Sequence, residues 1–177
     1  TLRQKPGVRI SKSSCTTEAL GSLDELNSFL GFLKVRALQL PMEVGGTPLA
    51  ALLHGMQENL FIVQAELAGA DKRITPEKVP ALEKIIDAAE KKLPSVKSFF
   101  IGGGAPNGRW SAARELAALL DVARTIARRA ERGAVAALEK KEATLSADTS
   151  AYLNRLSSLL YALVRFLHHN ARVPEAA

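Results

Sequence analysis

Four arginines lie within nine residues of the chain, and a single acidic residue, Glu131, lies among them. On a helix, Arg124, Arg128 and Glu131 are spaced at i, i+4 and i+7, so they share one face, with Arg129 and Arg132 flanking it. Guanidinium groups bind phosphate oxygens through paired hydrogen bonds, so this pattern favours a site for a phosphate-containing anion. A solvated basic face is the alternative reading. The apolar side chains between the arginines favour a partly buried stripe instead.

Asp24 is a candidate partner for one of these arginines. It lies near the start of a predicted first helix, on a face different from that of the neighbouring leucines. A carboxylate at this position also interacts favourably with the helix dipole, so a purely structural role stays open.

The remaining polar groups offer no catalytic set. Asn154 and Arg155 form a polar pair on a predicted helix, which by itself indicates a surface patch. The adjacent His168 and His169 diverge on a helix, so we assign them to its C-terminal dipole and predict no metal ligands. The glycines 102–104 lack the Lys-Ser/Thr ending of a phosphate loop and predict a turn. Any chemistry here therefore lacks an obvious protein nucleophile.

The composition indicates one globular domain spanning residues 1–177, with 47% hydrophobic and 24% charged residues. The 24 basic and 18 acidic residues give a net charge of +6, which favours an anionic partner. Aromatic residues make up only 5%, which weakens the case for base stacking on nucleic acid. Cys15 is the one cysteine, which fits a reducing compartment and predicts a cytoplasmic protein. No apolar run reaches the roughly 18 residues of a membrane span, so no membrane association is expected.

Apolar residues repeat every three or four positions along most of the chain, which predicts an all-α protein. The clearest seam is formed by leucines 153, 156, 160, 163 and 167. We expect five helices, at about residues 17–39, 48–68, 75–93, 111–141 and 147–170, with Ser146 capping the last and residues 1–15 irregular. The short links between them predict antiparallel neighbours in a five-helix, ferritin-like bundle.

Several segments are each weak evidence alone, but their occurrence together and in this order is specific for one protein family. They are residues 9–12 (RISK), 18–27 (EALGSLDELN), 99–104 (FFIGGG), 123–132 (ARTIARRAER) and 153–157 (LNRLS). From about Gly7 to Asn170 the chain thereby resembles the PduO-type ATP:cob(I)alamin adenosyltransferases. That resemblance implies a five-helix bundle assembled as a homotrimer, with ATP, Mg²⁺ and a reduced corrinoid (cobalamin) as ligands and a site between two subunits.

The resemblance also implies roles for individual residues. The positions that match ATP-binding residues are Lys12, Arg128, Arg129, Glu131, Arg132 and Asn154. Asp24 and Arg124 match a salt-bridged pair near the subunit interface, and together with Arg128 they are the expected catalytic residues. Phe99 matches the aromatic side chain that displaces the lower axial ligand of the corrinoid.

The implied reaction accounts for the missing protein nucleophile. The cobalt of cob(I)alamin attacks C5′ of ATP and triphosphate leaves, so the protein has to position two ligands and stabilise negative charge.

The chain departs from the family pattern at several points. The N-terminal phosphate segment is absent from these residues, Gly102 replaces a proline, 105–113 looks like an extra piece, and Ser158 stands where many members carry Asp.

Two alternative functions stay open at this stage. Ser158 and the altered glycine segment are compatible with an ATP-binding or regulatory bundle that has lost the reaction. The face 124–132 could instead belong to a basic helical module that binds nucleic acid. The scarcity of aromatic residues and the presence of Asp24 make nucleic acid the less favoured partner.

Overall fold

The fold is an antiparallel bundle of helices, seen in a computed structural model that describes residues 2–5, 8–91, 93–95, 101–105 and 108–171. Its helices are α1 (Cys15–Ala37), α2 (Leu49–Leu67), α3 (Lys78–Glu90), α4 (Ala112–Glu139) and α5 (Ala147–Asn170). The predicted all-α class and five helices are confirmed, and every predicted helix end lies within three residues of the observed one. None of the described helices is long and apolar enough to cross a membrane.

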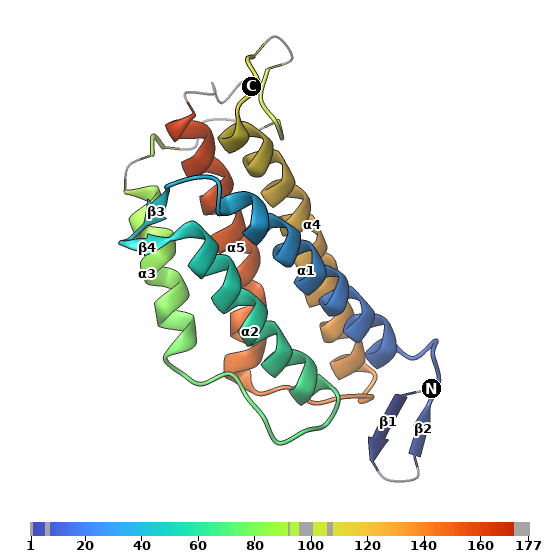
Figure 1. Cartoon of the computed structure of the whole chain (residues 1–177). Coiled ribbons are helices and arrows are strands. Elements are labelled where there is room, and N and C mark those ends of the chain that lie inside the picture. Colours follow the sequence, from blue (N-terminus) through green and yellow to red (C-terminus); the bar gives the residue numbers. More distant parts are fainter. Residues whose placement is uncertain (1, 6–7, 92, 96–100, 106–107, 172–177) are drawn as a thin grey trace.

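Two short hairpins precede and interrupt the helices. Strand β1 (Leu2–Lys5) pairs antiparallel with β2 (Val8–Ile10), and β3 (Glu43–Val44) pairs with β4 (Thr47–Pro48). The expectation that residues 1–15 are irregular was therefore wrong for this segment. Strands of two to four residues are too short to show a period of two. Figure 1 shows the first hairpin standing apart from the bundle at the start of α1.

The helices pack around α5, which contacts both α3 and α4, while α1 contacts α2 and α4. Side chains 162–168 of α5 are all buried, so this part of the helix is covered on every side. Such a helix is typical of the centre of a bundle. The grooves beside α5 are therefore walled by α3 and α4.

Serine side chains define where three helices begin. Ser14, Ser111 and Ser146 each accept a hydrogen bond from the backbone N–H three residues later, at the starts of α1, α4 and α5. The predicted cap at Ser146 is confirmed. The predicted start of α3 at Thr75 was wrong, because the Thr75 hydroxyl hydrogen-bonds the Glu77 carboxylate instead of capping the helix, which starts at Lys78.

Small residues bring α4 close to its neighbours. The alanines on its inner side are buried, namely Ala123, Ala127, Ala130, Ala134 and Ala137. A Cβ added at Gly133 would lie only 3.3 Å from the Cα of Ala19 on α1, so even alanine there requires the two backbones to shift by a few tenths of an ångström. Because the inner side of α4 is so tightly packed, the long arginine side chains of the same segment are confined to its outer sides.

A buried carboxylate fixes the start of α5. Glu66, on the last turn of α2, accepts hydrogen bonds from the Ser146 backbone N–H at 2.6 Å and from the Thr149 hydroxyl. The negative charge also faces the positive end of the α5 dipole. Glu66 thereby ties the end of α2 to the beginning of the central helix.

Glu66→Ala is expected to lower the free energy of unfolding by about 2–3 kcal/mol, the range for hydrogen bonds to a charged group. Urea unfolding followed by circular dichroism, at one fixed protein concentration, measures this. The control is Glu58→Ala on the same helix, whose exposed carboxylate lies 3.7 Å from His54 and should matter by less than about 0.5 kcal/mol. Equal effects of the two substitutions would show that Glu66 does not anchor α5.

Candidate functional site

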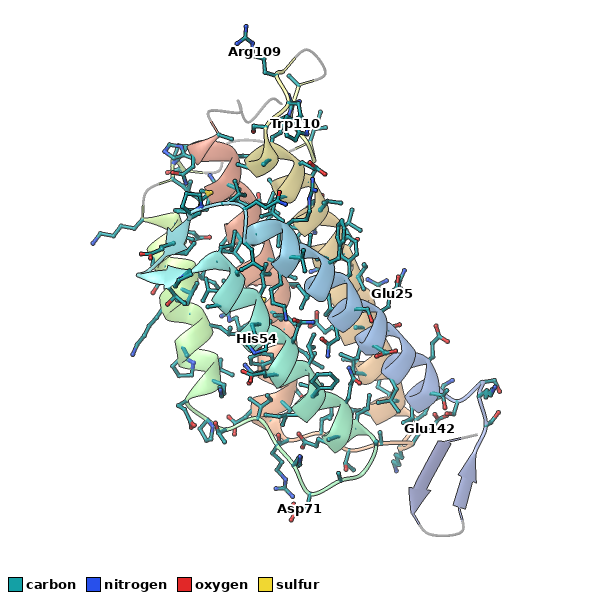
Figure 2. All side chains as sticks on the ribbon, in the orientation of Figure 1. Glu25, His54, Asp71, Arg109, Trp110 and Glu142 are labelled. Atoms are coloured by element: carbon teal, nitrogen blue, oxygen red, sulfur yellow. The ribbon has the colours of Figure 1, made fainter. Side chains whose placement is uncertain are left out.

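The arginine segment of α4 divides between two sides of the helix. Arg124 and Arg128 face α3 and α5, while Glu131 and Arg132 lie one to two turns further along on the side of Asn154. The predicted common face of Arg124, Arg128 and Glu131 agrees with this arrangement. Arg129 points the other way and pairs with Glu25 on α1. Figure 2 shows Glu25 on the flank of the bundle between α1 and α4.

The first groove, of about 650 Å³, runs between α3, α4 and α5. Its lining is Glu83, Ile86, Asp87 and Glu90 from α3, Arg124 and Arg128 from α4, and Arg155, Ser157, Ser158 and Tyr161 from α5. An acidic wall therefore faces a basic one across the groove. Ser158, singled out as a departure from the family pattern, lies within it.

The second groove, of about 300 Å³, continues along α4 towards its C-terminal end. It is lined by Arg128, Glu131, Arg132, Val135, Ala136, Glu139 and Asn154. The Asn154 amide donates a hydrogen bond to Glu131 Oε1 at 2.8 Å, which joins α5 to α4 across the groove. Arg128 belongs to both grooves, so its guanidinium lies at their junction.

Ion pairs neutralise some of these arginines and leave others available. Arg124 Nε lies 2.7 Å from Asp121 Oδ1, and Arg155 Nε lies 3.2 Å from Glu83 Oε1. Within the part of the chain that the structure describes, neither Arg128 nor Arg132 has a carboxylate within 4.0 Å. These two guanidinium groups are therefore the ones whose charge is left for an anion.

The expected pair of Asp24 and Arg124 is not formed within one chain. Asp24 is exposed on α1, beside an apolar groove between α1 and α2 that includes Phe61. Arg124 instead binds Asp121, a residue that sequence analysis did not single out. The spacing of three residues between Asp121 and Arg124 is a signal that could have found it.

The other predicted site residues lie further from the grooves. Lys12 is exposed on the link between β2 and α1 and is not among the residues that line either groove. Phe99 lies outside the described residues. His168 is buried and the adjacent His169 is exposed, so their side chains diverge as expected. Among the residues that the structure describes, no three His, Cys, Asp or Glu side chains gather as a metal site.

The segment before α4 contains a contact that sequence analysis missed. Arg114 donates hydrogen bonds to the backbone carbonyls of Gly103, Ala105 and Arg109. Gly103 and Gly104 adopt φ values of 82° and 71°, which favour glycine and confirm the predicted turn. No local pattern in the sequence signals this role of Arg114, because it depends on how the segment folds back over the helix.

The fold and the two grooves define a class of protein: a helical bundle whose grooves along α4 carry arginines suited to an anionic ligand and whose groove lining contains no Cys or His. Comparison with known proteins identifies the family. The family model described as cobalamin adenosyltransferase matches residues 3–167, and the chain belongs to this family.

Relatives and solved structures agree with this assignment. The chain is 37% identical over 170 residues to a corrinoid adenosyltransferase of Bacillus subtilis, covering 94% of this chain and 80% of the relative. It is 37% identical over 172 residues to the corrinoid adenosyltransferase PduO of Citrobacter freundii, covering 93% of this chain but 46% of that longer protein. A variant PduO-type ATP:corrinoid adenosyltransferase of Lactobacillus reuteri, complexed with cobalamin and ATP, superposes with a TM-score of 0.74 at 30% identity, covering 94% and 87% of the two chains.

Proposed function

We propose that this chain is an ATP:cob(I)alamin adenosyltransferase, which transfers the 5′-deoxyadenosyl group of ATP to cob(I)alamin and releases triphosphate. The observation that carries the proposal is the pair of unneutralised guanidinium groups, Arg128 and Arg132, along one groove of a bundle of this family. The leaving triphosphate carries several negative charges. Preorganised cations aimed at that charge lower the barrier to its departure.

The division of labour follows from the chemistry of the substrates. The cobalt of cob(I)alamin supplies the electron pair that forms the bond to C5′, and the C5′–O bond breaks with its electrons going to triphosphate. The protein therefore contributes orientation and charge stabilisation. We assign Arg128, Arg132, Glu131 and Asn154 to ATP, because they line one continuous groove.

Lys12, Arg129 and Phe99 complete the proposed set. Lys12 and Arg129 are assigned to ATP on the resemblance of their segments to the family motifs. Arg129 pairs with Glu25, so it reaches the nucleotide only if it leaves or shares that carboxylate. Phe99 is assigned to the lower face of the corrinoid on the same resemblance.

Mg²⁺ is proposed to arrive with ATP. Magnesium in nucleotide sites is bound largely by phosphate oxygens with few protein carboxylates. The second groove contains two carboxylates, Glu131 and Glu139, among its basic residues, so it can accept the ion without a dedicated protein cage. When bound, the ion would neutralise phosphate charge, with phosphate oxygens as its main ligands.

We also propose a homotrimer, in which Asp24 of one subunit pairs with Arg124 of the next. Asp24, on α1, lies at the groove between α1 and α2, whereas Arg124 faces α3 and α5. A contact between two different surfaces of identical subunits repeats around a ring when its rotation closes. One domain formed by residues 1–177 and a cytoplasmic location complete the proposal, supported by a continuous core and by the free Cys15.

The deciding experiment is an anaerobic assay with cob(I)alamin and Mg-ATP. Adenosylcobalamin should form, seen in the corrinoid spectrum, with one triphosphate released for each molecule made. ATP binding without adenosylcobalamin would favour the ATP-binding or regulatory alternative, to which Ser158 in the first groove is relevant. Binding of double-stranded DNA that weakens steeply with salt would favour the nucleic-acid alternative, although the acidic wall of α3 opposes it.

Arg128→Ala is expected to weaken ATP binding by about 1.5–3 kcal/mol, because it removes charge-assisted hydrogen bonds to phosphate. Isothermal calorimetry with Mg-ATP measures the change. The control is Arg73→Ala, which removes the same charge from the α2–α3 link, where Arg73 lies 3.9 Å from Asp71. Unchanged ATP affinity in a folded Arg128→Ala variant would refute the assignment of this groove to ATP.

A double-mutant cycle tests the proposed pair between subunits. Light scattering should give wild-type particles near three times the 19.0 kDa chain. Asp24→Ala and Arg124→Ala should each weaken assembly, and the second change should cost much less once the first is made. The control cycle combines Glu25→Ala with Arg124→Ala and should be additive, because Glu25 pairs with Arg129. Additivity in the Asp24 cycle would mean that Asp24 and Arg124 do not meet.

A further inference from the structure

The guanidinium of Arg114, on the first turn of α4, lies against the segment that precedes the helix. Its Nε donates to the Gly103 carbonyl at 2.7 Å and its Nη1 donates to the Arg109 carbonyl at 3.2 Å. Its Nη2 donates to the carbonyl of Ala105. One side chain therefore holds three backbone positions spread over seven residues, 103–109. Arginine suits this role because its donors are fixed in one plane.

Gly108 makes room for this guanidinium. A Cβ added at position 108 would lie 2.7 Å from Cζ of Arg114 and still closer to Nη1. The backbone of Gly108 is not in the left-handed region, so its conformation by itself permits alanine. The absence of a side chain at 108 is therefore explained by Arg114 and not by backbone strain.

The same segment also approaches α4 closely at Gly102, next to the ion pair of Asp121 with Arg124. A Cβ added at Gly102 would lie 3.0 Å from Oδ2 of Asp121, whose other oxygen binds Arg124. Arg124 lines the first groove beside Arg128. The segment thus lies against α4 at two places, Arg114 and Asp121. The second of these residues forms the ion pair with Arg124.

The segment also presents apolar surface. Ile101 is 60% exposed and Trp110 is 74% exposed, and Figure 2 shows Trp110 and Arg109 at the end of the molecule where α4 begins. Trp110 is held by a hydrogen bond of 3.3 Å from its indole N–H to Glu115, which pairs with Arg36 of α1. Of the two substrates proposed, the polyphosphate requires cations, whereas the broad faces of a corrin ring require apolar contact.

We infer that Arg114 is a positioning residue, which holds residues 101–105 and 108–110 against α4 so that Ile101 and Trp110 face the corrinoid. The inference rests on the proposed function and adds to it a residue that acts through the segment. The guanidinium does not touch ATP or cobalt in this assignment. Loss of Arg114 should therefore affect the corrinoid and leave the nucleotide unaffected.

Trypsin tests the contact without any ligand. The bond after Arg109 follows the carbonyl that Arg114 holds, so its cleavage requires release of that carbonyl. In Arg114→Lys and in Gly108→Ala, cleavage after Arg109 should be about fivefold faster, because a hydrogen bond that restrains opening is lost. Cleavage after Arg73, in the α2–α3 link, is the internal control and should not change. Gly55→Ala on α2 is the matched glycine control, because an added Cβ there meets nothing within 4 Å.

Steady-state kinetics test the consequence for the substrates. Both variants should raise the KM for cob(I)alamin about tenfold and leave the KM for ATP within about twofold, since a distant positioning error weakens only the contacts that it displaces. Lysine should not restore function, because it lacks the planar set of donors. Equal increases in both KM values would overturn the inference, as would unchanged cleavage after Arg109.

The two proposals fail in distinguishable ways. If the wild-type chain makes no adenosylcobalamin, the proposed function fails, while cleavage after Arg109 still decides whether Arg114 holds the segment. If the wild-type chain is active and both variants match it in proteolysis and in the KM for the corrinoid, only the role of Arg114 is refuted. The chain has one tryptophan, Trp110, so its fluorescence emission reports the same segment and should shift in both variants.

Discussion

The close packing of α4 is the constraint on which the site depends. Alanines on its inner side, and Gly133 against Ala19, bring the helix so near its neighbours that the arginine side chains have no room between them. The arginines of the same segment are therefore forced outward in fixed directions. A positive charge on a loosely packed helix could turn towards any nearby carboxylate, but here the direction of each arginine is set by the packed face opposite.

The carboxylates near α4 determine which of its arginines remain without an ion-pair partner. Asp121 and Glu25 neutralise Arg124 and Arg129 on two different sides of the helix. The free charge is concentrated at Arg128 and Arg132, on the side that adjoins Asn154. Part of the net excess of basic residues is thus left, within the described part of the chain, as two unpaired guanidinium groups on one side of α4, and the acidic wall of α3 bounds this side on one flank. The same acidic wall makes this side of the molecule unsuited to a long polyanion.

Features with a local cause were predictable from the sequence. The helices follow from apolar spacing, the cap at Ser146 from its side chain, and the common face of Arg124, Arg128 and Glu131 from helix geometry. Features that depend on which elements meet were not predictable in this way. Glu25 meets Arg129 only because α1 packs on α4, and Arg114 meets three carbonyls only because the preceding segment folds back. The short N-terminal hairpin carries too few residues for any periodicity.

The complete burial of the second half of α5 has a consequence for hydrogen exchange. Amides in 162–168 have packed side chains around them on every side, so they reach solvent only when the bundle opens as a whole. Asn154 and Ser157 belong to the same continuous helix, nearer its start. One wall of both grooves therefore belongs to the same helix as this slowly exchanging stretch, so partial opening of the hairpins leaves the helix that carries that wall in place.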